Sequence, residues 1–176
     1  MTAIQGILVL AVLGISAPAQ PKSEAAAEQR FFNIEDAVQH RVELSDAELS
    51  VLANDDLMRT ELHQDPAMPK PTQDGLEAGE VHLCRSGERD LVVIGYGAQF
   101  VGANVGPFWI IRDLKTGPVV VLSEITLGLV IETKRSNKCF NVEAIAATAA
   151  EPATKEFRFS GEKYIVYQQQ PRKSAQ

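Results

Sequence analysis

Hydrophobic and polar residues follow two different patterns along the chain, and an aperiodic stretch separates them. In the first half, Leu49, Leu52, Ala53 and Leu57 recur with the period of a helix and fall on one of its faces. Residues 65–80 then hold three prolines and two glycines without periodicity, so they predict a loop. In the second half, runs rich in Val, Ile, Thr and Phe predict β-strands.

The start of the helix carries its own signals. Ser45 and Glu48 have the spacing of a capping box, in which each side chain bonds a free backbone N–H of the first turn. Leu44 and Leu49 occupy the two positions of a hydrophobic staple. We therefore expect a helix from about Asp46 to Leu62.

Eight short segments of the second half are bounded by Gly, Pro, Asn, Asp or charged residues. They span residues 81–86, 90–96, 108–113, 118–124, 127–133, 140–146, 155–160 and 163–169. Since no helix is predicted between them, they favour an antiparallel meander. Phe157 and Phe159 alternate along the seventh segment, and Ser160 with Gly161 supplies a tight turn into the last.

These elements predict an α+β protein, in which an N-terminal helical segment precedes an antiparallel β meander of about seven to eight short strands. The expected organisation is a helical segment over residues 20–64 and a loop over 65–80. An antiparallel β domain over 81–170 and a disordered tail over 171–176 follow.

The N-terminal residues 1–19 are predicted to be a signal peptide. An apolar stretch runs from Ile7 to Leu13, and Ala17-Pro18-Ala19 has the form of a cleavage site. A retained membrane anchor is the alternative, but the stretch is shorter than the roughly 20 residues that span a bilayer. We expect cleavage after Ala19, a periplasmic or secreted protein, and no stable membrane insertion afterwards.

Charge narrows the range of partners. The net charge is -6, the pI is near 5.1, and Lys and Arg form no basic stripe. We therefore do not expect nucleic acid or an anionic membrane surface as a partner. An exported protein is the partner class left open. Nothing in the sequence indicates a cofactor, and nothing in it sets the oligomeric state.

The two cysteines, Cys84 and Cys139, predict a disulfide because an even pair in an exported protein is read first as a bridge. A metal site and a nucleophilic thiol are the alternatives, since His82 lies two residues from Cys84. Neither alternative has the repeated ligand spacing that a metal site requires.

Four glycines lie in the stretch 95–109, but their spacing is not that of a phosphate-binding loop, and a strand rather than a helix follows. We expect a joint between strands across Gly97 to Pro107. Trp109 lies where the chain re-enters the sheet; it is expected either in the core or, as an exposed aromatic, in a binding surface.

Catalytic motifs are missing from the sequence. There is no nucleophile elbow and no histidine pair at metal-binding spacing, so neither catalytic nor metal-ligating residues are predicted. A rival hypothesis is an exported hydrolase or metal-dependent enzyme assembled from dispersed residues such as His82, Asp90 and Glu124.

Three segments resemble a loosely defined group of small exported bacterial β-rich proteins, most of them without an assigned activity. They are GANVGPFWIIRD (102–113), NKCFNVEAIA (137–146) and FRFSGEKYIVY (157–167). The middle segment departs from the group's turn pattern at Lys138, Cys139 and Asn141. The resemblance implies export and a small antiparallel β domain.

SGEKY (160–164) is similar to the S-G-x-x-Y motif of periplasmic lysozyme inhibitors. In those proteins the serine and tyrosine enter the lysozyme cleft, which implies a binding role here for Ser160, Gly161 and Tyr164. The sequence thus favours an exported, non-enzymatic binding or accessory protein. An inhibitor of a cell-wall hydrolase and an exported enzyme are the alternatives.

Overall fold

The computed structural model describes residues 29–36, 38–61, 73–84, 87–96, 100, 105–146 and 153–167. The predicted signal peptide (1–19), the tail (171–176) and most of the glycine-rich joint lie outside the described residues. Within the described part of the chain, no helix is long and apolar enough to cross a membrane.

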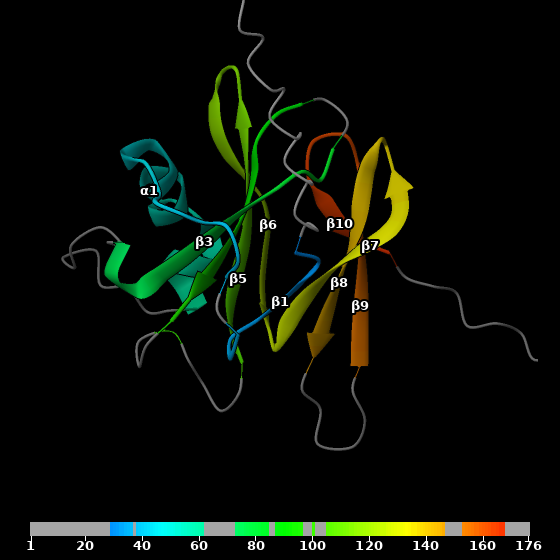
Figure 1. The fold of residues 1–176 in the computed structure, drawn as a ribbon, viewed down its shortest axis with the longest axis horizontal. Helices are drawn as coiled ribbons and strands as arrows, with labels where there is room; N and C mark the ends of the chain where they lie inside the picture. The colour runs from blue at the N-terminus through cyan, green and yellow to red at the C-terminus, as the bar shows by residue number, and fades with distance from the viewer. Residues whose placement is uncertain are drawn as a thin grey trace, which may run out of the picture.

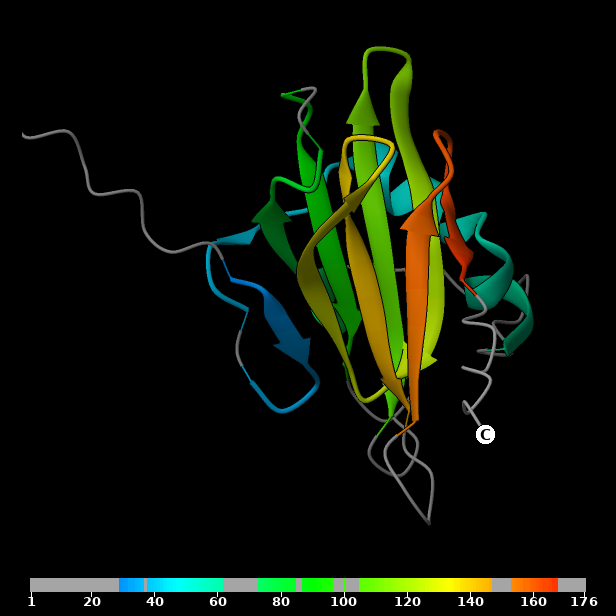
Figure 2. The same cartoon turned by 90° about the vertical axis from the view of Figure 1, so that its right-hand side faces the viewer.

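In the described part of the chain, ten strands form two antiparallel sheets of five, which face each other as a sandwich (Figures 1 and 2). The central sheet has the order β2-β3-β4-β5-β6, with strands Arg41–Val42, Leu76–Val81, Asp90–Gly95, Gly106–Leu114 and Gly117–Thr126. The outer sheet has the order β1-β7-β8-β9-β10, with strands Phe31–Asn33, Gly128–Ser136, Cys139–Ala146, Ala153–Phe159 and Tyr164–Val166. The central sheet is thus a meander of five consecutive strands, and the outer sheet joins β1 to a meander of four, β7 to β10.

The central sheet is covered on both faces. One face packs on the outer sheet through residues such as Val92 and Ile110, and the other packs under the helical segment through Leu91 and Trp109. Figure 1 shows helix α1 on the side of this sheet that faces away from β7–β10. Because both faces are buried, β4 and β5 read as continuous apolar runs instead of an alternation.

Helix α1 (Asp46–Ala53) starts at the predicted capping box. The N–H of Glu48 donates to the Ser45 hydroxyl over 3.3 Å, and the N–H of Ser45 donates to the Glu48 carboxylate over 2.6 Å. The predicted helix to Leu62 is interrupted, because Asp55 accepts bonds from the backbone of the next turn. A separate π-helical turn, η1 (Leu57–Glu61), follows.

The predicted α+β fold class is wrong, because the protein is mostly β and its strands form two sheets. The segment predicted to be helical supplies strands β1 and β2, and β3 begins at Leu76 inside the predicted loop. Strands of three and two residues carry no detectable period. Their conformation is fixed by partners, with β1 on β7, which lies about a hundred residues later, and β2 on β3.

Two hairpin turns of the outer sheet are formed by residues with positive φ angles. Asn137 and Lys138 join β7 to β8 with φ of 47° and 70°, the pair of positive angles that a tight hairpin turn requires. Gly161, at φ 118°, lies in the turn between β9 and β10, where the sequence predicted a glycine-dependent turn.

Candidate functional site

The two lateral seams of the sandwich differ. On one side, β1 pairs with β7 and its Phe32 packs against β3, so the seam is closed. On the other side, edge strand β6 of the central sheet and edge strand β10 of the outer sheet bound an open cleft of about 680 Å³. Figure 2 shows β10 at the margin of the outer sheet, beside the helical segment.

The cleft has four walls: the start of turn η1, strand β6, strand β9, and the β9–β10 hairpin with β10. Its lining residues are, in that order, Asp55, Asp56, Leu57, Val120, Val121, Leu122, Ser123, Glu124, Lys155, Phe157, Lys163, Tyr164, Ile165 and Val166. Apolar side chains and charged or polar side chains share the lining. Such a lining is typical of binding sites, which combine an apolar surface with a few orienting polar groups.

Strand β6 is irregular where it lines the cleft. Ile110 pairs with Leu122, but Ile111 pairs with Val120, so Val121 is an extra residue in β6. Such a bulge bends and twists an edge strand and makes it a poor template for a further strand. This wall therefore gives the cleft its shape without offering a regular edge.

Strand β10 presents a regular edge with an apolar surface. The N–H of Ser160 donates to the Lys163 carbonyl over 2.8 Å, and the N–H of Tyr167 donates to the Glu156 carbonyl over 2.8 Å. In an antiparallel pair, bonding residues alternate with non-bonding ones. The backbone groups of Tyr164 and Val166 therefore point away from β9, towards the free edge.

Exposed apolar residues continue along this edge. Ile165, Val166 and Tyr167 are 49%, 46% and 40% exposed, which is high for three consecutive large apolar side chains. Consecutive strand residues point to opposite faces, yet both Ile165 and Val166 line the cleft. The cleft therefore runs along the edge of β10 and not across one face.

The charges in the cleft are unevenly matched. The Lys155 ammonium bridges the seam to Glu124 over 2.8 Å, and Asp56 pairs with Arg59 over 2.6 Å. Among the described residues, the Lys163 ammonium has no ion-pair partner and is exposed at the hairpin end of β10. It is the cation of the cleft most available to a ligand.

Asp55 fixes the wall of the cleft. Its carboxylate accepts the indole N–H of Trp109 over 2.9 Å, the Ser123 hydroxyl over 2.8 Å and the N–H of Leu57 over 3.1 Å. Trp109 is fully buried against Phe100, so the core is where the structure places it and not a binding surface. With these bonds made, Asp55 acts as a structural tie between the helical turn and the central sheet.

The SGEKY hairpin divides into an exposed tip and a buried end. Ser160 and Gly161 are exposed, and the Ser160 hydroxyl donates to the Lys163 carbonyl over 2.7 Å. Tyr164 is only 6% exposed, and its hydroxyl donates to the carbonyl of Phe140 over 2.8 Å. Burial raises the pKa of the Tyr164 hydroxyl well above its usual value. Tyr164 is thus held in the core while Ser160 and Gly161 face solvent.

The predicted disulfide between Cys84 and Cys139 is present and links the segment that follows β3 to the first residue of β8, one from each sheet. Beside it, the Arg112 guanidinium donates to the carboxylate of Asp90 over 2.9 Å, and both side chains are buried. Asp90 also accepts the N–H of Leu83 over 2.9 Å. The pair is satisfied inside the sandwich, as buried charges must be.

The dispersed residues of the enzyme hypothesis lie in different surroundings. Asp90 is buried beside Arg112, Glu124 binds Lys155 in the cleft, and His82 is exposed. The described part of the chain holds no group of three or more His, Cys, Asp or Glu side chains that could bind a metal ion.

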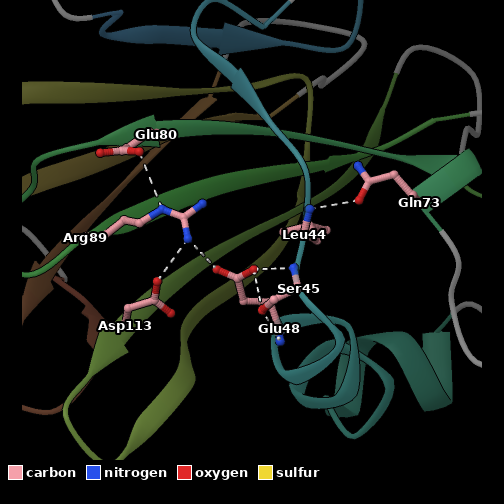
Figure 3. A network of polar contacts seen from close by, with 7 residues as sticks. All are labelled: Leu44, Ser45, Glu48, Gln73, Glu80, Arg89 and Asp113. Atoms are coloured by element: carbon pink, nitrogen blue, oxygen red, sulfur yellow. Dashed lines mark hydrogen bonds and ion pairs between the residues drawn. The ribbon is translucent and has the colours of Figure 1, made fainter.

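A second polar cluster anchors helix α1 (Figure 3). The Arg89 guanidinium contacts Glu48 of α1 over 3.1 Å, Asp113 of β5 over 3.2 Å and Glu80 of β3 over 3.5 Å. Burial, reinforced by the nearby Glu48 carboxylate, raises the pKa of Asp113, while Arg89 opposes the shift. Since Glu48 is 1% exposed and bonds Ser45 as well, the cluster holds the helix on the sheet.

Sequence reasoning missed the cleft. Its walls come from four segments between Asp55 and Val166, and no motif joins them. The available signal was the run Ile165-Val166-Tyr167, which places apolar side chains on both faces of a terminal strand and so indicates an edge with an unusual environment.

Fold and cleft together define the class: a disulfide-linked antiparallel β-sandwich with a helix on one outer face and an open lateral seam. Compared with family models, with curated proteins and with solved structures, the chain gives no match.

Proposed function

We propose that this is an exported, non-enzymatic binding protein whose ligand occupies the cleft between β6 and β10. The observation that carries the proposal is the cleft of about 680 Å³, which combines apolar and polar side chains and has the Lys163 ammonium at one end. Binding sites are commonly clefts of roughly 300–1,000 Å³ with this composition. The signal-like residues 1–19 and the disulfide support export, since disulfides persist mainly in oxidising compartments.

A capture experiment with a matched pair of variants tests the binding role. The mature protein, beginning at Gln20, is immobilised and exposed to periplasmic and culture-supernatant extracts, and bound proteins and small molecules are identified by mass spectrometry. Val166→Arg places a charge in the cleft, whereas Thr133→Arg adds the same charge at an exposed position of β7. A ligand retained by the parent and by Thr133→Arg but lost from Val166→Arg supports the proposal. Equal recovery on all three contradicts it.

Inhibition of a cell-wall hydrolase is the second candidate, because the exposed tip of the SGEKY hairpin lies at the rim of the cleft. Here Ser160 and Lys163 would contact the enzyme, since the hydroxyl of Tyr164 is engaged with Phe140. Titration of the mature protein into a panel of lysozymes tests this. Inhibition that is weakened by Ser160→Ala and kept by Tyr164→Phe supports it; unchanged lysozyme activity across the panel excludes the tested enzymes as targets.

Export is tested separately. The full chain with residues 1–19 and a chain that begins at Gln20 are expressed in a bacterium and fractionated. Recovery of the first in the periplasm or medium, shortened at its N-terminus, supports the proposal. Retention of both in the cytoplasm contradicts it.

A further inference from the structure

We infer that the ligand of the cleft is an extended segment of a partner polypeptide, which pairs through its main chain with β10 and carries a carboxylate towards Lys163. The inference rests on the proposed binding function and names the ligand class. A free strand edge presents N–H and C=O groups in register, and an added strand satisfies them all.

The hydrogen-bonding pattern of β10 supplies the first argument. Ile165 pairs with Arg158, and the residues on either side of it, Tyr164 and Val166, direct their backbone groups to the free edge. Both residues line the cleft. An incoming strand would therefore meet the donors and acceptors of β10 inside the cleft, where the walls exclude part of the solvent and strengthen each bond.

The side chains supply the second argument. An added strand would bring its own side chains beside Ile165 and Val166, whose large exposed surfaces lack cover among the described residues. Alternating apolar residues on the incoming segment would bury this surface. Covering it is favourable by the usual hydrophobic term, so backbone pairing would give direction and apolar contacts would add affinity.

Charge supplies the third argument, because it indicates where the ligand carries an acidic group. Lys155 is neutralised by Glu124 over 2.8 Å, while the Lys163 ammonium has no ion-pair partner in the described part of the chain. Lys163 precedes β10 directly, so an acidic residue at that end of the ligand would complete an ion pair. A carboxylate is accordingly expected near one terminus of the paired segment.

The shape of the seam decides between a single strand and a second copy of this chain. The edge of β10 lies in a cleft that is also walled by β6 and by Leu57 at the start of η1. Pairing two folded copies edge to edge would bring these walls of both copies into the same space. The bulge at Val121 also makes β6 unsuitable as the template, which leaves β10 for the incoming strand.

Substitutions at Val166 test the main-chain pairing. Val166→Pro removes the N–H that points to the free edge, and proline is tolerated on edge strands at such positions. Val166→Thr keeps the N–H and the branched shape. The probe is a displayed library of short linear peptides, selected on the immobilised mature protein, from which enriched peptides are synthesised with and without alternate N-methylated amides.

The expected result is binding to the parent and to Val166→Thr, with a loss of about fivefold to tenfold in affinity for Val166→Pro, the effect of one hydrogen bond. N-methylation of alternate ligand amides should weaken binding similarly, and it tests the same bonds if Val166→Pro does not fold. Bound peptide should slow hydrogen exchange of the Val166 amide. Lys163→Glu should weaken peptides that contain an acidic residue more than their amide counterparts.

Three outcomes would overturn the inference. Equal affinity for Val166→Pro and Val166→Thr, with no effect of N-methylation, would exclude main-chain pairing while leaving the binding role intact. Concentration-dependent dimers in sedimentation, lost in Val166→Pro, would assign the edge to a second copy. Failure to enrich any peptide, together with capture of a small molecule from extracts, would replace the ligand class but keep the proposed function.

Discussion

The two seams of the sandwich show how one architecture produces a closed core on one side and an open cleft on the other. At the closed seam, β1 adds to the edge of the outer sheet, and Gly79 of β3 leaves room for Val38 and Phe32. At the open seam, the described residues place no such strand between β6 and β10, and the side chains that cross the seam include the pair Lys155 and Glu124. Backbone pairing and close apolar contact therefore close a seam of the sandwich, whereas an ion pair across a seam leaves it accessible.

Removing the disulfide should give the largest loss of stability, because the disulfide fastens the two sheets on the side of the closed seam. A Cys84→Ala, Cys139→Ala double variant should lose about 4 kcal/mol in the free energy of unfolding, since the bridge closes a loop with a sequence separation of 55. Denaturant unfolding measures the loss. A double variant as stable as the parent would show that strand pairing alone holds the sheets together.

Adding a side chain at the closed seam should give the next largest loss of stability. A Cβ at Gly79 would collide with the Val38 side chain and lie 3.2 Å from the carbonyl of Gln39, so Gly79→Val should cost about 2 kcal/mol of stability. The matched enlargement at the open seam, Val166→Ile, should stay within about 0.5 kcal/mol, because Val166 is 46% exposed. Thermal unfolding of both variants tests the contrast, and equal losses would refute the distinction between the seams.

Removing the ion pair that crosses the open seam should have a small effect. Glu124→Gln should cost less than about 1 kcal/mol, since Lys155 is 43% exposed and solvent screens the pair. Glu132→Gln, which removes the exposed pair with Lys134 on β7, is the matched control and should cost about as little. A much larger loss for Glu124→Gln would mean that charge, and not strand pairing, sets the width of the cleft.

Substituting either of two tyrosines, Tyr96 or Tyr164, should change stability least at neutral pH. Burial, followed by the charge of Glu77, raises the pKa of Tyr96 to about 12, and burial raises the pKa of Tyr164 further. Between about pH 10, the unfolded value, and the folded value, the native state binds more protons than the unfolded state. Stability should therefore fall as pH rises through this interval and stay unaffected below it.

Absorbance titration at alkaline pH, combined with unfolding curves, measures this loss. Tyr96→Phe and Tyr164→Phe should each reduce the fall in stability above pH 10. Because Tyr164 also donates to the Phe140 carbonyl, its variant should be slightly less stable than the parent at neutral pH. Unchanged alkaline behaviour in both variants would contradict the assigned shifts.

Local signals in the sequence predicted several elements correctly. The capping box at Ser45 and Glu48 is formed as predicted, and the disulfide joins Cys84 to Cys139. These features depend on residues a few positions apart, or on the only two cysteines in the chain. The fold class was wrong because β1 and β2 take their conformation from distant partners, and short strands carry no period of their own.

The predicted binding residues also show that residue type alone does not predict burial. Trp109 and Tyr164 could be proposed as binding residues from their types, but burial decides their roles, and both donate hydrogen bonds within the protein. Ser160 and Gly161 remain exposed at a hairpin tip, as a turn sequence suggests. Exposure depends on which segments pack against a residue, and that information is spread over the whole chain.

Local sequence features were enough to predict where α1 starts, where the β9–β10 hairpin turns, which cysteines pair and most of the strands from β4 to β10. These outcomes follow from hydrogen bonding and backbone preference within a few residues. The closing of one seam by β1, and the open seam between β6 and β10, depend on how the two sheets assemble. Strand edges are satisfied by partners far away in the sequence, so no local pattern predicts which edge stays unpaired.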